Sequence, residues 1–163
     1  MAKVYIGLGS NLSDPKNQIH LAVDALKNIK HCNLTNLSSL YFSRPMGPQD
    51  QPDYMNAVAE ISTELSPLHL LDELQTIENL AGRVRKNNRW GARILDLDIL
   101  LFDNEVISHE RLTVPHYGLE LREFVLLPLV EISPELILPN GKNISALSRN
   151  IETNGLKIHS KLR

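Results

Sequence analysis

The sequence predicts an α+β fold, a ferredoxin-like α/β sandwich with a mainly antiparallel sheet. Two stretches of helical periodicity each lie between stretches with strand character, which gives the order β-α-β, β-α-β with short connections. The 163 residues suit one domain with its own core, and no internal repeat or linker divides them. We therefore expect a single domain over residues 1–163, with a loose tail after about residue 150.

The first β-α-β unit is predicted over residues 4–42. Residues 4–8 have strand character and run into Gly7-x-Gly9, which we interpret as a tight strand-to-helix turn. Asp14 before Pro15 predicts a helix start with a side-chain cap, and residues 34–42 predict the next strand. Apolar residues at helical spacing give this helix one buried face: Ile19, Ala22, Val23, Leu26 and Ile29.

The second unit follows residues 43–53, which hold three prolines and a glycine and are therefore expected to form a loop. Residues 54–63 alternate as a strand with one core face, and residues 94–102 predict a buried strand. Between them, Ser66-Pro67 predicts the start of a helix and Gly82 its end. The apolar stripe of this helix consists of Leu70, Leu71, Leu74, Ile77 and Ala81.

Beyond residue 102 the sequence predicts only short elements. A turn at Asp103-Asn104 precedes a strand at 111–114 and a short helix or turn at 119–127. Residues 136–138 form a last apolar patch, and the turn signal Pro139-Asn140-Gly141 closes it.

The composition argues against several classes of protein. The formal net charge is -2, so the chain as a whole does not favour binding to nucleic acid or to an anionic membrane. No apolar run approaches the roughly 20 residues of a membrane span. The single cysteine, Cys32, has no second cysteine with which to form an internal disulfide. We expect a cytoplasmic monomer with no nucleic-acid or membrane partner.

The strongest local signal for chemistry is the acidic pair Asp96 and Asp98. Residues two apart in a strand point to the same face, and at ~6 Å two carboxylates repel by roughly 2–3 kcal/mol if the effective dielectric is near 20. Two Mg²⁺ ions shared with substrate phosphates would neutralise this pair, whereas a solvated face without a ligand is the alternative interpretation. The neighbours expected on the opposite, core-facing side are Leu95, Leu97, Ile99 and Leu101.

A basic segment lies directly upstream of the acidic pair. No acid occurs between Glu78 and Asp96. The cations in that interval are Arg83, Arg85, Lys86, Arg89 and Arg93. Because arginines bind phosphate oxygens and aspartates bind Mg²⁺, the two segments together predict a cleft for a polyphosphate with its metal ions. The alternative is a solvated run of charge, against which the adjoining acids and Trp90 argue.

Several aromatic residues lie in or beside the irregular segments, where they have the shape to stack on a flat ring, although each alone is more often a core residue. They are Tyr54, Trp90, Tyr117 and Phe124. A lone histidine such as His116 is more often structural than catalytic. The sequence has no zinc-ligand spacing, and Gly7-x-Gly9 completes neither a dinucleotide fingerprint nor a P-loop.

Four segments together resemble the 6-hydroxymethyl-7,8-dihydropterin pyrophosphokinases of folate biosynthesis. They are residues 5–12, 47–54, 89–98 and 114–117, and the block Trp-Gly-x-Arg-x-x-Asp-x-Asp within 89–98 is highly specific. The resemblance covers about the first 140 residues. It implies a transferase of the kinase class that moves the pyrophosphoryl group of ATP onto the pterin hydroxymethyl oxygen and releases AMP.

The resemblance also implies roles for individual residues. Asp96 and Asp98 would hold two Mg²⁺ ions that bridge the ATP phosphates, and Arg83 and Arg93 would be catalytic arginines that close on those phosphates. The implied nucleotide-binding set is Gln75, Glu78, Arg85, Trp90, Ile99, Arg111, Thr113, His116, Tyr117 and Arg122. The implied pterin-binding set is Ser43, Met46, Gly47, Tyr54, Asn56 and Phe124, with Tyr54 and Phe124 on the two faces of the ring.

The segments 43–53 and 82–91 are the expected long active-site loops, which would order on binding and exclude water. Arg44 departs from the family pattern, in which a small residue or a proline is common at this position.

Two other functions are compatible with parts of this pattern. An RNA-binding α/β module would use the basic segment and the aromatics, without metal and with strong salt dependence. A Mg-dependent phosphohydrolase would use the same aspartates and release phosphate without a pterin. A purely structural protein would need no such concentration of opposite charges.

Overall fold

The computed structural model describes residues 1–11, 14–43, 54–82 and 94–162. The strands are β1 (Ala2–Ser10), β2 (Cys32–Leu37), β3 (Ser39–Ser43), β4 (Tyr54–Thr63), β5 (Asp96–Phe102), β6 (Ile107–His109), β7 (Leu112–Val114) and β8 (Lys157–Lys161). The helices are α1 (Pro15–Lys27), α2 (Pro67–Gly82), α3 (Glu123–Ile132) and α4 (Ile144–Arg149).

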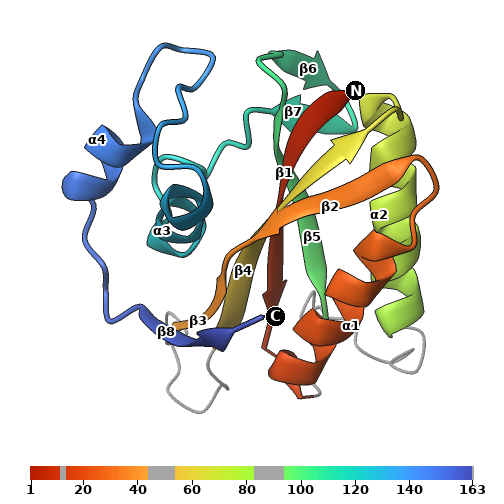
Figure 1. Cartoon of the computed structure of the whole chain (residues 1–163), viewed down its shortest axis with the longest axis horizontal. Coiled ribbons are helices and arrows are strands. Elements are labelled where there is room, and N and C mark those ends of the chain that lie inside the picture. The colour runs from red at the N-terminus through yellow and green to blue at the C-terminus, as the bar shows by residue number, and fades with distance from the viewer. Residues whose placement is uncertain (12–13, 44–53, 83–93, 163) are drawn as a thin grey trace.

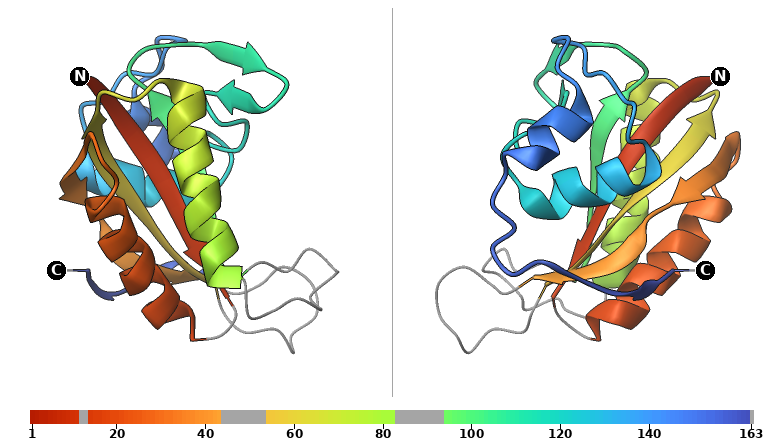
Figure 2. Two further views of the ribbon diagram at one scale, coloured as in Figure 1. Left: turned by 90° about the vertical axis from the view of Figure 1, so that its right-hand side faces the viewer. Right: turned by 60° about the vertical axis from the view of Figure 1, so that its left-hand side comes forward.

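The central sheet has the strand order β5-β1-β4-β3-β8, and β2 also pairs with β4. Each of these pairings is antiparallel. Because α1 lies between β1 and β2 in the chain and α2 between β4 and β5, the predicted ferredoxin-like core is confirmed. Figure 1 shows α1 and α2 on one face of the sheet, with α3 and α4 on the other. In Figure 2, α1 and α2 lie side by side.

The two predicted amphipathic helices bury the apolar faces expected of them. Ile19 and Leu26 of α1 and Leu70 and Leu74 of α2 have no exposed surface. They pack with residues of β1, β4 and β5 in one apolar cluster between these helices and the sheet. This cluster anchors the strands from which the functional side chains project.

The two helix starts differ in how they are capped. Ser66 accepts a hydrogen bond on Oγ from the backbone N–H of His69 at 3.3 Å, as the Ser66-Pro67 signal predicted. The predicted side-chain cap at Asp14 is wrong, because no such bond forms there. Asp14 has a φ of 61°, in the left-handed region, whereas a capping side chain needs an extended backbone.

The strand predicted over residues 34–42 is divided at Ser38 into β2 and β3. The Ser38 N–H donates to the Val58 carbonyl at 2.9 Å, but the Val58 N–H donates to the Ser38 hydroxyl at 2.8 Å. The Ser38 side chain thus takes the place of a backbone carbonyl in the ladder. The two strands consequently pair with β4 in different registers, Leu37 with Ala59 and Tyr41 with Asn56.

The strand β4 is buried on both faces rather than on one, which corrects the prediction from its alternation. Val58, on the face expected to be polar, has no exposed surface. It belongs to a second apolar cluster with Val125, Leu126 and Leu129 of α3. The alternation of residues 54–63 gave no sign of this helix, which begins at Glu123 and extends beyond the segment predicted as a helix or turn.

A bulge in β5 changes the side on which Leu101 lies. Tyr5 pairs with Leu101, but the next residue, Ile6, pairs with Ile99, so Leu100 is the extra residue on β5. Leu101 is buried as predicted, but it packs with Tyr5 in the cluster under α3, not with Ile99 in the other. The assignment of Leu101 to the same face as Ile99 was therefore wrong.

The C-terminal segment, which the sequence led us to expect loose, pairs with the sheet. Strand β8 runs antiparallel to β3, from the pair Phe42 and Lys157 to the pair Ser39 and Lys161. Leu162 is 6% exposed and packs into the apolar cluster beneath α1 and α2. Backbone hydrogen bonds to β3, which a polar sequence does not reveal, account for the regular structure of this segment.

Among the helices of the described segments, none has the length and apolar character needed to cross a membrane.

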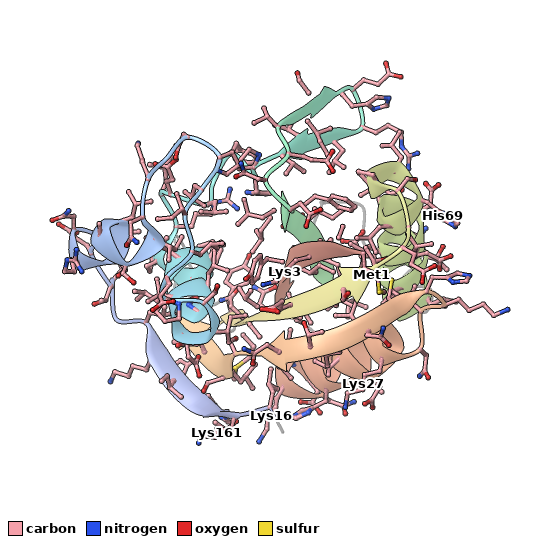
Figure 3. All side chains as sticks on the ribbon, turned by 45° about the horizontal axis from the view of Figure 1, so that its top comes forward. Met1, Lys3, Lys16, Lys27, His69 and Lys161 are labelled. Atoms are coloured by element: carbon pink, nitrogen blue, oxygen red, sulfur yellow. The ribbon has the colours of Figure 1, made fainter. Side chains whose placement is uncertain are left out.

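The labelled lysines Lys16 and Lys27 of α1 and Lys161 of β8 lie at the outer edge of the molecule (Figure 3).

Glu131 of α3 ties that helix to β3. Its carboxylate accepts hydrogen bonds from the Ser39 N–H at 2.9 Å, the Ser39 hydroxyl at 2.7 Å and the Tyr41 hydroxyl at 2.8 Å. We predict that Glu131→Ala lowers the free energy of unfolding by about 2 kcal/mol, because hydrogen bonds to a charged group are lost and Ser39 is buried. Urea denaturation measures this change. The exposed Glu135→Ala is the control and should shift stability by less than about 0.5 kcal/mol, and equal effects would contradict the prediction.

Candidate active site

A cavity of about 720 Å³ opens on the α3 side of the sheet. It is bordered by the central strands β5, β1 and β4 and by the segment that leads into α3. The described residues that line it are Gly7, Leu8, Gly9, Tyr54, Asn56, Ala57, Asp96, Asp98, Leu100, Leu121, Arg122, Glu123, Phe124, Val125 and Asn154.

The floor of this cavity is formed where β1 carries two glycines. Gly9 pairs with Asp96 on one side and with Asn56 on the other, and residues paired in this way point to the same face. Gly7 likewise pairs with Asp98 and with Val58. Because neither glycine has a side chain, the middle strand leaves open space between the acids and β4.

A side chain at Gly9 would intrude on this space, since its Cβ would lie 3.2 Å from Asn56 Oδ1. The interpretation of Gly7-x-Gly9 as a strand-to-helix turn is wrong, because both residues lie within β1. Glycines inside a strand often mark a place where a ligand approaches the backbone closely, and this was the signal available in the sequence.

Asp96 and Asp98 both line the cavity, and the side chain of Asp98 is 51% exposed. Between them, the backbone N–H of Leu97 donates a hydrogen bond to Glu78 Oε2 at 2.8 Å, while the Leu97 side chain is buried. Glu78 of α2 therefore fixes the backbone that carries the acidic pair.

His116 lies next to Asp98, held by two hydrogen bonds. The backbone N–H of His116 donates to the Leu100 carbonyl at 3.0 Å. The ring Nδ1 accepts from the backbone N–H of Gly118 at 3.0 Å. The neutral imidazole therefore carries its proton on Nε2, which lies 3.9 Å from Asp98 Oδ2. Burial lowers the pKa of His116, the Asp98 carboxylate opposes that shift, and the Arg122 guanidinium adds to it. The ring stacks on that of Tyr117, with 4.5 Å between centroids.

Arg122 is the one cation among the described residues that line the cavity. Its guanidinium carbon lies 5.1 Å from the centroid of Tyr117 and 5.7 Å from that of Phe124, and it donates to the Tyr117 hydroxyl at 3.0 Å. Gly118 permits this conformation, because a Cβ there would lie 2.6 Å from Arg122 Nε. Gly118 could not be recognised from the sequence, since a single glycine after an aromatic residue indicates no more than a turn.

Tyr54 and Phe124 line the cavity together with Asn56. Asn56 is only 6% exposed, and its Nδ2 donates to the Ser43 hydroxyl at 3.3 Å. That bond orients the amide, whereas Ser43 itself is not among the described residues that line the cavity. Two rings and a buried amide at one end of a cavity form a suitable environment for a flat, polar ring.

Other members of the predicted nucleotide set lie outside the cavity lining. Arg111 donates to Asp72 Oδ1 at 2.6 Å and to Gln75 Oε1 at 3.2 Å, which joins α2 to the turn before β7. Thr113 is exposed on β7. Ile99 is 2% exposed and its side chain belongs to the core beneath α1 and α2, as strand alternation predicts.

The remaining predicted site residues lie outside the described residues. They are Arg83, Arg85, Trp90 and Arg93 of the basic segment, and Met46 and Gly47 of the proline-rich segment.

The described residues contain no cluster of three or more His, Cys, Asp or Glu side chains able to hold a metal ion by themselves. Asp96 and Asp98 instead offer two carboxylates on one wall of the cavity. Mg²⁺ is usually held in this way, by one or two carboxylates together with substrate phosphates and water. The donor set therefore fits Mg²⁺ that is bound jointly with a phosphorylated substrate.

Known proteins with similar sequences indicate the family of this chain. A model of the family described as 7,8-dihydro-6-hydroxymethylpterin-pyrophosphokinase matches residues 5–134. A 2-amino-4-hydroxy-6-hydroxymethyldihydropteridine pyrophosphokinase of Haemophilus influenzae is 58% identical over 147 residues, covering 90% of this chain and 91% of that protein. The protein of the same name from Pseudomonas aeruginosa is 50% identical over 145 residues and covers 89% of each chain.

A solved structure supports the fold assignment. The Plasmodium falciparum HPPK-DHPS crystallised with pteroate has a TM-score of 0.71 at 16% identity, covering 91% of this chain. This chain spans 42% of that longer protein, and at this identity the likeness bears on the fold alone. From the matching family model and the two relatives, it follows that the chain belongs to the 7,8-dihydro-6-hydroxymethylpterin-pyrophosphokinase family.

Proposed function

We propose that this chain transfers the pyrophosphoryl group of ATP to the hydroxymethyl oxygen of 6-hydroxymethyl-7,8-dihydropterin and releases AMP. The observation that carries this proposal is that one cavity joins the acidic pair on β5 to Tyr54 and Phe124 across a floor of glycine. Metal-bound phosphates suit the acidic end, and a flat ring suits the aromatic end. Group transfer requires that two substrates lie side by side in this way.

We assign two Mg²⁺ ions to Asp96 and Asp98, bound together with the ATP phosphates. When bound, such ions neutralise phosphate charge and polarise the oxygens that they contact. The repulsion between the two carboxylates, expected from their spacing on β5, provides the reason for cations at this wall. The Glu78 carboxylate supports the pair by holding the backbone of Leu97.

The protein's own contribution is to position the substrates and to balance their charge. Tyr54 and Phe124 would enclose the pterin ring, and the oriented amide of Asn56 would hydrogen-bond its edge. Arg122 and His116 would contact phosphate oxygens, because His116 lies beside Asp98 and the Arg122 guanidinium is near enough to His116 to lower its pKa. The other side chains proposed for ATP are Gln75, Arg83, Arg85, Trp90, Arg93, Arg111, Thr113 and Tyr117, with the backbone of Ile99.

We also propose that the protein acts in the cytoplasm as a monomer, without a nucleic-acid partner. The lone cysteine, Cys32, is buried and forms no disulfide, which is compatible with a reducing compartment. The net charge of -2 argues against the RNA-binding alternative.

Product analysis is the direct test of the proposed reaction. With Mg-ATP and 6-hydroxymethyl-7,8-dihydropterin we expect AMP to form only when the pterin is present, because the cavity joins the two substrate sites. Chromatography of the nucleotides measures this. Formation of ADP would indicate an ordinary kinase, and free phosphate without pterin would indicate the phosphohydrolase. Removal of Mg²⁺ with EDTA should abolish AMP formation and leave the fold intact.

Loss of either acid should stop turnover. We predict that Asp96→Ala and Asp98→Ala each lower kcat/KM by at least about 10³-fold, because several kcal/mol of metal-ion stabilisation would be lost. Both variants should still fold, since neither side chain belongs to an apolar cluster of the core. Asp24→Ala, at an exposed position on α1, is the control and should retain full rate. A near-normal rate in either cavity variant would remove that residue from the site.

The glycine floor provides a steric test. We predict that Gly9→Val lowers kcat/KM by at least about tenfold, since a side chain there displaces Asn56 and occupies the space between the two substrates. Valine is favourable in strands, so circular dichroism should still report a folded protein. Lys3→Val, at an exposed position on the same strand, should leave the rate unchanged. Equal rates in the two variants would mean that the floor is not part of the site.

A further inference from the structure

The C-terminal segment reaches the cavity at Asn154, which lies beyond the residues that match the family model. Asn154 and Gly155 are the central residues of a tight turn, closed by a hydrogen bond of 2.9 Å from the Leu156 N–H to the Thr153 carbonyl. Their φ angles are 50° and 79°. Positive φ at both positions defines a type I′ turn, for which Asn-Gly is a favoured sequence. The backbone therefore has a specific reason to present Asn154 at this point.

Pairing with the sheet holds this turn in position. Immediately after it, β8 begins with Lys157 opposite Phe42 of β3. The next residue of β3, Ser43, pairs with Tyr54, the first residue of β4. The turn is thus fixed near Tyr54, one of the aromatic residues that line the cavity. Figure 1 shows β8 beside β3. Leu162, buried beyond β8, anchors the strand on its other side.

The order of the strands separates the cavity into two chemically different ends. Asp96 and Asp98 belong to β5 at one edge of the sheet, whereas Asn154 precedes β8 at the other edge. Asn56, on β4, lies between them. An uncharged amide at the end away from the acids suits an uncharged heterocyclic ring better than a phosphate.

The amide of Asn154 is available for a ligand. Asn154 is exposed, and its side chain forms no hydrogen bond to another of the described residues. A carboxamide carries two donors and one acceptor, and the edge of a pterin ring presents both kinds of group. The turn fixes the backbone from which this amide projects, so a hydrogen bond to the ring would cost little ordering of the chain.

We propose that Asn154 is a specificity-determining residue that hydrogen-bonds the edge of the pterin ring, with the turn at 153–156 as one wall of the pterin end of the cavity. This inference rests on the proposed function for the identity of the ring. It assigns to the C-terminal segment a part in substrate binding in addition to its pairing with β3.

The test replaces Asn154 by glycine, since glycine accepts a positive φ and removes only the side chain. Asn154→Gly should raise the KM for the dihydropterin and its dissociation constant by roughly three- to tenfold, the effect of one lost neutral hydrogen bond. The kcat and the KM for ATP should stay unchanged. Thr153→Ala, a neighbouring exposed residue that does not line the cavity, is the control and should match the parent protein in every constant.

Calorimetric titration with 6-hydroxymethyl-7,8-dihydropterin separates failure of this inference from failure of the proposed function. If the parent protein binds the pterin without forming AMP, the proposed reaction fails, and weaker binding by Asn154→Gly still supports the inference. If the parent protein forms AMP and Asn154→Gly binds the pterin equally well, the inference is overturned and the reaction stands. Equal increases in the KM for ATP and in the KM for the pterin would also overturn it, because they would indicate a general structural defect.

Discussion

The pairing of β1 between β4 and β5 is the constraint on which the whole site depends. This register sets Gly9 between Asp96 and Asn56 and Gly7 between Asp98 and Val58. A slip of one residue would turn the acids into the core and the apolar side chains of β5 into the cavity. The register is held by burial on the opposite face, where Val4, Ile6 and Leu8 pack beneath α1 and α2. Stability of the core and geometry of the site therefore have the same origin.

The bulge at Leu100 reconciles two demands on β5. Near its start, the strand must direct Asp96 and Asp98 toward the cavity, and further along it must supply apolar side chains to the cluster under α3. The extra residue allows Leu100 and Leu101 both to join that cluster, while Phe102 returns to the other core. Bulges often stand beside functional sites for this reason, since they change the direction of side chains without ending the strand. Here the change of direction begins two residues after Asp98.

The features that could be predicted from the sequence are those set by local periodicity. The stripes of α1 and α2, the ends of β4 and the alternation around Asp96 and Asp98 depend on spacing within one segment. Most of the errors arose where a distant segment decides the outcome. Ser38 divides a strand through its bond to Val58, and α3 buries the second face of β4. The role of Asn154 is equally invisible, because its turn is recognisable locally but its place beside the cavity depends on the pairing of β8.

The distribution of charge within the cavity gives a physical account of how two very different substrates are kept in order. A phosphate chain that carries metal ions would be stabilised at the β5 end, where Asp96 and Asp98 line the cavity and His116 lies 3.9 Å from Asp98. The side chains of Tyr54, Asn56 and Asn154, which also line the cavity, would offer such a charged group no ionic partner. A neutral ring loses little there and gains stacking area against Tyr54 and Phe124. The two ends would therefore favour different ligands, and the glycine floor between them would leave space for the transferred group.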